Sequence, residues 1–493
     1  MWITTEDASS LRPKHWLFLP DAHHAEVCAK LDHQAPDGRA DIVNRYAGMW
    51  NDRTMRAQLR LWGVPVSDQA VWRRRKQVSN DSDRYIRTVT CWVYDCEVIA
   101  AGVSGVAPSG SMLIQRLESW NQLPYRRLAR LAVKTAYALG YDTLQVTMQA
   151  GFVSSTADND SLGVLDEPEQ GDLVVHASPV TEHAPGWLRR LYQQRMTRGQ
   201  MESFGVRRAG LGENRTSSTS LYDAAPVRYG MDCEFVLYDE HRGKILSASY
   251  FLPLGGTAGC DAVRMKGKVV YPLMELRPEP AESPEQLVLH LQAAMREADA
   301  MIHQSDYSDA VSWLAGAYPR SRLPIGCHIH FSGIPLHMEF IRALDTYAAL
   351  PLSLFEPDLR RSRRPAYGTF GDVRLQDHEG CGGFEYRTLP NFLYGQELTV
   401  DILRLIDIVR RSYPHLHRRD AVDADVQRSF LSGYDRQKYR RAGICALMEL
   451  TPHCETQKEL QSLERIIHLL HSQWTWNEEM DVRPLWLRHQ KEV

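Results

Sequence analysis

The chain has 493 residues and a mass of 56.3 kDa, and 43% of its residues are hydrophobic and 24% charged. At about 100–200 residues per domain, this length allows two to four domains. The ordinary composition excludes a disordered or fibrous protein, and a formal net charge of −3 provides no global attraction to nucleic acid or to an anionic membrane. The sequence therefore predicts a globular protein with neither of these partners.

The N-terminus and the cysteines indicate where the protein resides. The first residues lack the basic start and apolar core of a secretory signal. Nine cysteines are scattered along the chain without a Cys-x-x-Cys pair, which is typical of reduced thiols rather than of a disulfide framework. We therefore expect a cytoplasmic protein with free thiols and no structural zinc site.

The first 150 residues predict a small α/β domain. A hairpin is expected over residues 84–106, a helix over 124–139 and a strand over 143–148. This order distantly resembles the last lobe of an ATP-grasp domain, but Met148–Gly151 stand where the acidic and asparagine ligands of that lobe are expected. The resemblance implies a degenerate, structural accessory domain. Residues 151–225, rich in acidic, Ser/Thr and Pro patches, predict a linker with one short helix near 188–196.

The remaining residues, 226–493, predict a second domain of strands and helices. Ser283 and Pro284 open a helix that runs to about residue 303, because serine caps a helix and proline fits its first position. Further helices are expected over 336–349 and 398–412. The tail over 424–486 reads as helical with a break at 450–452. The glycine-rich stretch 254–261 is either a loop over a site or a hairpin connection.

Four predicted strands of this domain carry charge on one face and apolar side chains on the other. Side chains two residues apart in a strand share a face. The charged sets are Asp232 and Glu234; Glu275, Arg277 and Glu279; His328 and His330; and Glu385 and Arg387. If the strands pair in one antiparallel sheet, its polar face presents carboxylates, imidazoles and guanidinium groups, while helices cover the other face. Pro278 and Pro280 predict that the second strand ends there or lies at an edge.

The chemistry of this polar face favours metal-assisted phosphoryl transfer. Hard cations such as Mg²⁺ take carboxylate oxygens and bridge them to phosphates, and arginine forms a planar fork that suits phosphate or carboxylate. Positioning and charge neutralisation carry most of the catalysis in phosphoryl transfer. A zinc hydrolase would also use a His-x-His pair, but the two arginines and the surplus of carboxylates fit that site less well.

Five segments together are similar to one known ligase family. They are Gly230–Phe235, Glu275–Pro280, Gly326–Gly333, Tyr367–Arg374 and Gly383–Arg387. In this order they resemble the phage phiEco32-like COOH-NH2 ligase type 2 (amidoligase) proteins, which have the glutamine synthetase/glutamate-cysteine ligase fold. The resemblance spans roughly residues 229–412.

The resemblance implies an α+β fold, with a curved antiparallel sheet covered by helices on one face, beside the N-terminal α/β accessory domain. It also implies an ADP-forming ligase that uses ATP and Mg²⁺ or Mn²⁺ to phosphorylate a carboxylate, after which an amine displaces phosphate from the acyl phosphate. The expected substrates are an amino acid, a peptide or a protein, and the fold is compatible with a homo-oligomer.

Carried over by position, the resemblance implies a role for each residue of the polar face. Metal ligands would be Glu234, Glu275, Glu385 and His328, with Asp232 and Glu279 as additions. Glu275, Arg277 and Arg387 would act in catalysis, with Arg387 steadying the transferring phosphoryl group and Arg277 holding the substrate carboxylate. His328 and His330 would contact nucleotide or its phosphates. The basic run 360–364 and the segment that follows it could hold nucleotide phosphates or an acidic substrate, or be a solvated loop, and the adjoining Tyr-Gly-x-x-Gly-Asp pattern favours a functional role for Arg364 and Arg374.

Two other functions remain open at the level of sequence. A phosphotransferase on the same fold, like the guanidino kinases, would need the same sheet residues. A catalytically idle structural or coat-associated protein would keep the fold alone, although an idle site has no physical need for so many charges on one face.

Overall fold

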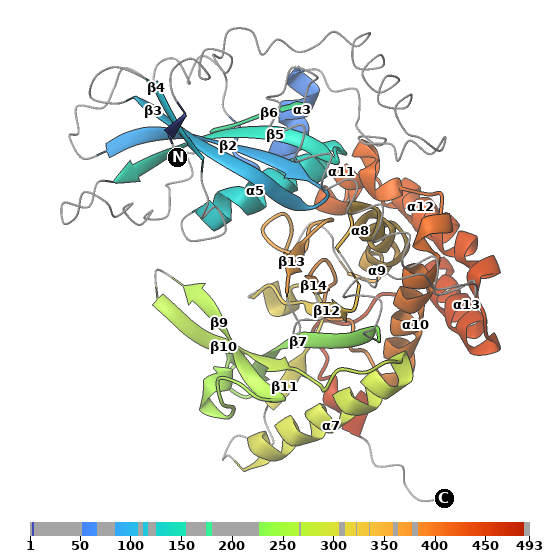
Figure 1. The fold of residues 1–493 in the computed structure, drawn as a ribbon. Helices are drawn as coiled ribbons and strands as arrows, with labels where there is room; N and C mark the ends of the chain where they lie inside the picture. Colours follow the sequence, from blue (N-terminus) through green and yellow to red (C-terminus); the bar gives the residue numbers. More distant parts are fainter. Residues whose placement is uncertain are drawn as a thin grey trace, which may run out of the picture. The chain divides into compact units, whose positions relative to one another are not determined.

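A computed structural model describes the chain over residues 2–3, 52–66, 84–106, 112–116, 125–153, 174–179, 226–265, 268–304, 311–321, 323–334, 336–357, 363–376 and 383–487. The chain divides into two compact units, Met1–Phe204 and Gly205–Val493 (Figure 1). We describe each unit by itself. The predicted domain limits at residues 150 and 226 stay predictions.

The first unit is built on a six-stranded antiparallel sheet with the order β1-β4-β3-β2-β5-β6. Strand β2 (Arg84–Tyr94) and strand β3 (Glu97–Val106) form the predicted hairpin. The two residues between them, Asp95 and Cys96, have φ of 47° and 70°, as a tight two-residue hairpin turn requires. The other strands are β1 (Trp2–Ile3), β4 (Met112–Arg116), β5 (Thr143–Val153) and β6 (Val174–Pro179).

Two helices share the described core of this unit with the strands of its sheet. Helix α5 (Tyr125–Leu139) matches the predicted helix and contacts β2, β3 and β5. Helix α3 (Asp52–Leu61) packs against α5, and just beyond its end the ring of Trp62 lies 5.8 Å from that of Tyr137. Strand β6 lies within the residues predicted to be a linker and pairs with β5. The helix predicted near 188–196 lies outside the described residues.

The second unit contains the predicted antiparallel sheet. Six of its eight strands follow the order β13-β14-β12-β7-β10-β9, and the other two, β8 and β11, pair with β7 (Figure 1). The four charged segments fall on four of these strands, β7 (Arg228–Asp239), β10 (Lys268–Leu276), β12 (Cys327–Ser332) and β14 (Gly383–Tyr386). The others are β8 (Lys244–Ile245), β9 (Ala258–Met265), β11 (Val311–Leu314) and β13 (Val373–Leu375). The prediction that these segments share one sheet is confirmed.

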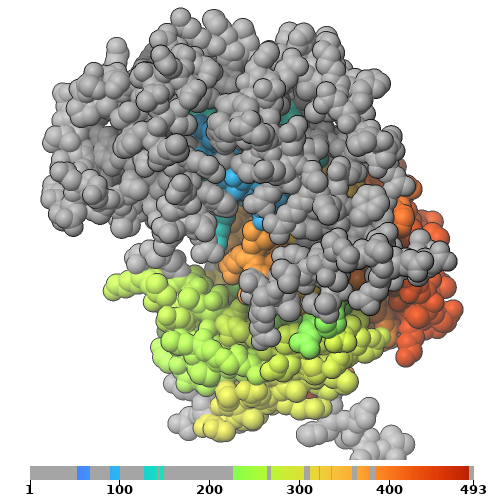
Figure 2. All heavy atoms as spheres, in the orientation of Figure 1, coloured from blue at the N-terminus to red at the C-terminus, as the bar shows by residue number. Residues whose placement is uncertain are grey.

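Helices cover the apolar face of this sheet, so the predicted α+β architecture holds for the second unit. Phe331 of β12 and Phe384 of β14 stack with their ring centroids 5.0 Å apart. Phe340 of helix α8 (Met338–Leu344) packs edge-on to Phe331 at 5.3 Å. The hydroxyl of Tyr229, on β7, donates to Asp407 of helix α10 (Gln396–Ser412). In the space-filling view, residues coloured green to yellow, which by the bar lie between about 226 and 304, gather on one side of the second unit (Figure 2).

The predicted helices of this unit are confirmed. Helix α7 (Pro284–His303) begins as expected, with the Ser283 hydroxyl accepting from the Gln286 amide at 3.2 Å. Helices α8 (Met338–Leu344) and α9 (Leu350–Ser353) are joined through a π-helical turn, and α10 (Gln396–Ser412) follows. The tail consists of α11 (Ala424–Ser432), α12 (Arg436–Leu450), α13 (Gln457–His471) and α14 (Arg483–Leu487), with the expected break after Leu450. Among the described residues, no helix combines the length and apolarity needed to cross a bilayer.

One prediction about the cysteines is wrong. Cys233 and Cys327 form a disulfide between β7 and β12, whereas the sequence predicts free thiols throughout. The pairing register sets the two residues opposite each other, with their Cα atoms 4.0 Å apart. The two cysteines are 94 residues apart in the sequence, so their proximity can be predicted only from the register in which β7 and β12 pair.

A half-buried carboxyl in the tail, Glu478, predicts a pH dependence of stability. Oε1 of Glu478 accepts from the amide of Ala317 at 2.6 Å, and burial raises the pKa of this carboxyl to about 7. A carboxyl with a raised pKa in the folded state stabilises the fold fully below its unfolded pKa, and that stabilisation is lost as pH rises through 7. Allowing for partial exposure, we expect the contribution to fall by about 2 kcal/mol between about pH 5 and about pH 8.

Urea unfolding at several pH values measures this contribution as the difference between the wild type and Glu478→Gln. The neighbouring Glu479, which is exposed, offers a matched control as Glu479→Gln. We expect the pH dependence to flatten in the first variant and to stay as in the wild type in the second. Equal pH slopes in all three proteins would contradict the assignment.

Candidate functional site

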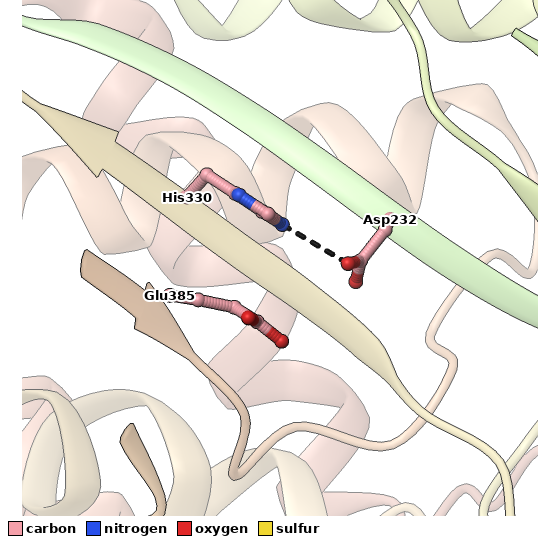
Figure 3. A group of neighbouring side chains, drawn as sticks. All are labelled: Asp232, His330 and Glu385. Atoms are coloured by element: carbon pink, nitrogen blue, oxygen red, sulfur yellow. Dashed lines mark ion pairs between the residues drawn. The ribbon is translucent and has the colours of Figure 1, made fainter. Parts of the chain in front are cut away.

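Three adjacent strands bring one group of ligand-capable side chains together. Asp232 on β7, His330 on β12 and Glu385 on β14 each offer an atom within 4.8 Å of the others; we call them group 1. His330 lies opposite Glu385 in the strand register, and its Nε2 is 3.1 Å from Oδ2 of Asp232. The three side chains point toward one another from the same face of the sheet (Figure 3). Their proximity follows directly from the alternation of side chains along the paired strands.

His328 lies beside group 1 and faces two of its carboxylates. Its Nδ1 is 2.7 Å from Oδ1 of Asp232 and 3.2 Å from Oε1 of Glu385. Burial alone would lower the pKa of this imidazole, but the hydrogen bonds to the two carboxylates outweigh it and raise the pKa to about 9. In this arrangement Nδ1 of His328 lies against two carboxylates at once.

The same contacts keep the two carboxylates ionised. Burial opposes ionisation of Asp232, yet the hydrogen bonds from His328 and His330 hold the pKa of its carboxyl well below the ordinary range. Burial likewise opposes ionisation of Glu385, and the bond from His328 together with the charge of Arg387 lowers the pKa of this carboxyl. Group 1 thus presents two negative charges to any bound cation.

Two arginines converge on Glu385 from neighbouring segments. Nη1 of Arg374, on β13, lies 3.0 Å from Oε2, and Nε of Arg387, just after β14, lies 3.2 Å from Oε1. Glu385 is buried, whereas the side chains of Arg374 and Arg387 are 39% and 22% exposed. Each guanidinium can therefore hold the carboxylate with one nitrogen and offer others to an anion at the surface.

A second group lies on the neighbouring strands of the same face. Glu234 on β7, Glu275 on β10 and Asp261 on β9 each offer an oxygen within 4.8 Å of the others; we call them group 2. Oε2 of Glu234 accepts from the amide of Gly326 at 2.7 Å. Burial raises the pKa of Glu234, and the negative charge of Asp261 adds to the effect despite nearby His328. Arg277 forms an ion pair with Glu275. A cation would relieve the repulsion within this group.

Asp261 is a member of group 2 that lies outside the four charged segments predicted from the sequence. The stretch ending at Asp261 was expected to be a loop or a hairpin connection, but Ala258 opens strand β9, which pairs with β10. In this register Asp261 stands opposite Leu273, two residues from Glu275, and so shares its face. The available signal was the alternation of the buried Cys260 with Asp261, since one apolar and one acidic residue in succession is typical of a half-buried strand.

Asp261 therefore provides a direct test of group 2. We expect Asp261→Asn to weaken Mn²⁺ binding at group 2 by at least about tenfold, because the neutral amide no longer supplies a charged oxygen. Electron paramagnetic resonance titration of Mn²⁺ measures this change. Glu279→Gln is the control, and we expect wild-type binding from it; equal weakening in both variants would contradict the composition of group 2.

Two residues predicted for the site do not join either group. Strand β10 ends at Leu276, as its prolines predict, and Glu279 lies exposed beyond it. Arg364 is buried, with its Nη2 2.7 Å from Glu356 and its Nε donating to the carbonyl of Gly368 at 3.1 Å. The basic run around Arg364 therefore contributes a buried ion pair here. The other predicted residues all lie in or beside the two groups: Asp232, Glu234, Glu275, Arg277, His328, His330, Arg374, Glu385 and Arg387.

Comparison with known proteins identifies a match over this unit. The family model for phage phiEco32-like COOH.NH2 ligase-type 2 matches residues 229–487, slightly more than half of the chain. No curated protein sequence matches.

Three solved structures show distant similarity, each over 50% of this chain. A bifunctional glutathione synthetase from Pasteurella multocida is 10% identical, with 47% of its own chain covered and a TM-score of 0.38. In the complex between the prokaryotic ubiquitin-like protein Pup and its ligase PafA, the matching chain is 10% identical, with 65% of its own length covered and a TM-score of 0.32. Glutamate–cysteine ligase from Francisella tularensis in complex with AMP is 9% identical, with 82% of its own chain covered and a TM-score of 0.35. The match therefore spans less than two thirds of the first two structures.

Proposed function

Because the chain belongs to the phage phiEco32-like COOH.NH2 ligase-type 2 family, we propose that its second unit is a ligase that joins a carboxylate to an amine at the expense of ATP. The observation that carries this proposal is the joint placement of groups 1 and 2 on one sheet face, with Arg374 and Arg387 against Glu385. Anionic and cationic side chains so close together suit a reaction in which phosphate charge must be neutralised and positioned.

The two groups have the donor chemistry for Mg²⁺ or Mn²⁺. Group 2 offers three carboxylates, and group 1 offers two carboxylates and the imidazole of His330. Carboxylate oxygens are the ligands that hard divalent cations take, usually together with substrate phosphates. Such a cation supplies neutralisation of phosphate charge and orientation of the phosphoryl group when it is bound. Glu275 also has a proposed role in catalysis. Its ion pair with Arg277 connects group 2 to the arginine that would bind the substrate carboxylate.

The basic residues have roles that follow from their positions. Arg387 is partly exposed beside Glu385 and would stabilise negative charge on the phosphoryl group in transfer. Arg374, which contacts Glu385, and His330, which contacts Asp232, would hold nucleotide phosphates. Arg277, 34% exposed at its side chain, would bind the substrate carboxylate. His328 would keep Asp232 and Glu385 oriented and ionised rather than ligate metal.

The reaction proposed is an ADP-forming ligation in two steps. An oxygen of the substrate carboxylate attacks the terminal phosphorus of ATP, the bond to the bridging oxygen breaks, and ADP leaves. The nitrogen of the amine then attacks the acyl carbon, phosphate leaves with the electron pair of the broken bond, and the amine gives up a proton. We propose an amino acid, a peptide or a protein as substrate. A cytoplasmic location, a homo-oligomer and the absence of a nucleic-acid partner stay predictions.

Phosphate release from ATP, measured with pairs of amino acids and short peptides in the presence of Mg²⁺, tests the proposal. We expect phosphate only when both a carboxylate and an amine are present, and a product whose mass is that of the two substrates less one water. ATP consumption with a single substrate and no amide product would favour a phosphotransferase instead. Calorimetry that shows no binding of ATP and Mg²⁺ would favour an idle structural protein.

A further inference from the structure

A buried arginine outside both groups occupies the point where two strands of the site separate. Arg363 is 5% exposed. Its Nη1 donates to the carbonyl of Ile325 at 3.0 Å, and its Nη2 donates to the carbonyls of Arg387, Thr388 and Leu389 at 3.2, 2.8 and 2.5 Å. A buried guanidinium that donates to carbonyls of two separate segments fixes the distance between them, because each unmade bond would leave a buried polar group unsatisfied.

The two segments are the continuations of β12 and β14 beyond their pairing. The strands pair from Ile329 opposite Tyr386 to Ser332 opposite Gly383. Beyond Ile329 and Tyr386 the described residues show no further pair in this register, and the two segments are joined there by the Cys327 amide, which donates to the Leu389 carbonyl at 3.3 Å. We call this opening the fork. Arg363 fills it and replaces the missing ladder with hydrogen bonds of its own.

Two glycines make room for this guanidinium. A Cβ built on Gly326 would lie 2.4 Å from Nη1 of Arg363, and one on Gly368 would lie 2.4 Å from its Nε and Nη2. Gly368 also has φ of 61°, a conformation that favours glycine. The backbone therefore approaches the guanidinium from two directions, and any other residue at either glycine would displace it.

The fork carries contacts that both groups depend on. On one side, the amide of Gly326 donates to Glu234 of group 2, and His328 follows two residues later. On the other side, Arg387 holds Glu385 of group 1 with its side chain while its own carbonyl accepts from Arg363. Arg363 therefore bonds to the carbonyl of Ile325, just before Gly326, and to the carbonyl of Arg387, and each of these segments contacts one of the two groups. Arg363 itself belongs to neither group.

We infer that Arg363 is a positioning residue, which sets the width of the fork and thereby places the Gly326 amide on Glu234 and the Arg387 side chain on Glu385. The catalytic consequence of this placement rests on the proposed function, whereas the geometric consequence does not. Widening the fork would move both contacts at once, so one residue couples the two groups.

Three variants of the full-length chain test this inference. Arg363→Met keeps the aliphatic volume and removes all donors, and Arg363→Lys keeps a charge and a donor. The matched control is Arg419→Met. Arg419 is also a buried arginine that donates to backbone carbonyls, at Leu416 and Arg418, and it reaches Glu339, none of which belongs to the fork or to either group.

Hydrogen exchange followed by mass spectrometry measures how well the backbone amides of the fork are protected. Mn²⁺ titration by electron paramagnetic resonance measures the cation affinity of the two groups. We expect Arg363→Met to speed exchange of peptides covering 325–331 and 387–389 at least about tenfold while α13 exchanges as in the wild type. We also expect it to weaken Mn²⁺ binding at least about tenfold. Arg363→Lys should lie between Arg363→Met and the wild type. Arg419→Met should lose comparable stability in urea and keep wild-type Mn²⁺ affinity.

Each other outcome decides the matter. Wild-type Mn²⁺ affinity in Arg363→Met, or equal weakening in Arg419→Met, would overturn the positioning role. If the wild type itself binds no Mn²⁺, the metal part of the proposed function fails, and the exchange data alone decide the inference: faster exchange confined to the fork supports it, and uniformly faster exchange overturns it. If Arg363→Met does not fold, the same comparisons are made with Arg363→Lys.

Discussion

Replacing Glu385 with glutamine is expected to weaken Mn²⁺ binding at group 1 about 100-fold or more and to abolish ATP-dependent phosphate release. The carboxylate is buried and is contacted by His328, Arg374 and Arg387. The neutral amide would leave three cationic side chains without their shared counter-charge, and these would repel a bound cation instead of being held away from it. Electron paramagnetic resonance titration and phosphate release measure the two effects.

A matched variant separates this effect from a loss of stability. Glu356 is as buried as Glu385 and also pairs with an arginine, Arg364, at 2.7 Å, but it lies in neither group. Each of Glu385→Gln and Glu356→Gln should cost roughly 3 kcal/mol of the free energy of unfolding, because each removes one partner of a buried ion pair. We expect only the first to lose Mn²⁺ binding. Equal Mn²⁺ affinity in the two variants would show that Glu385 is structural.

Replacing Arg387 with alanine is expected to lower the rate of phosphate release, at saturating substrates, about 100- to 1000-fold, with a small change in the KM for ATP. A guanidinium that stabilises charge only as the phosphoryl group is transferred affects the rate and not ground-state binding. The side chain is partly exposed, so the variant should fold. Steady-state kinetics with the substrate pair found by the phosphate-release screen measures both constants.

Arg374→Ala is the natural comparison, since Arg374 contacts the same carboxylate from a more exposed position. If Arg374 holds nucleotide phosphates in the ground state, its loss should raise the KM for ATP and leave the maximal rate nearly unchanged. The opposite pattern, with the rate effect in Arg374→Ala and the KM effect in Arg387→Ala, would exchange the two proposed roles. Identical effects would argue that both arginines act only by supporting Glu385.

The polar face of the second sheet could be predicted from the sequence, because strand periodicity alone decides which side chains share a face. Met231, Cys233 and Phe235 are buried on one face, and Asp232 and Glu234 stand on the other. Ser283 and Pro284 likewise predict the start of helix α7, because the serine caps the helix and the proline fits its first position without any partner distant in sequence. These predictions succeed because each depends on residues a few positions apart.

Which side chains meet could not be predicted, because this depends on the register of strands distant in sequence. Asp261 joins group 2 only because β9 pairs with β10. His328 and His330 look equivalent in the sequence, yet the register places His328 against two carboxylates at once. Arg363 and Arg364 are adjacent, and the fold sends one to the fork and the other to Glu356. No local pattern distinguishes the members of such pairs.

The two groups differ in how much of the chain must fold before each can exist. Group 2 joins Glu234 to Glu275 within a contiguous stretch of about 40 residues, whereas group 1 requires Asp232 to meet Glu385 across about 150 residues. The entropy of closing a loop increases with its length, and contacts distant in sequence form late. During synthesis, the residues of group 2 can therefore assemble on β7, β9 and β10 while β14 has yet to be made. If group 2 binds a cation as proposed, all of its residues are made before group 1 and its arginines are complete.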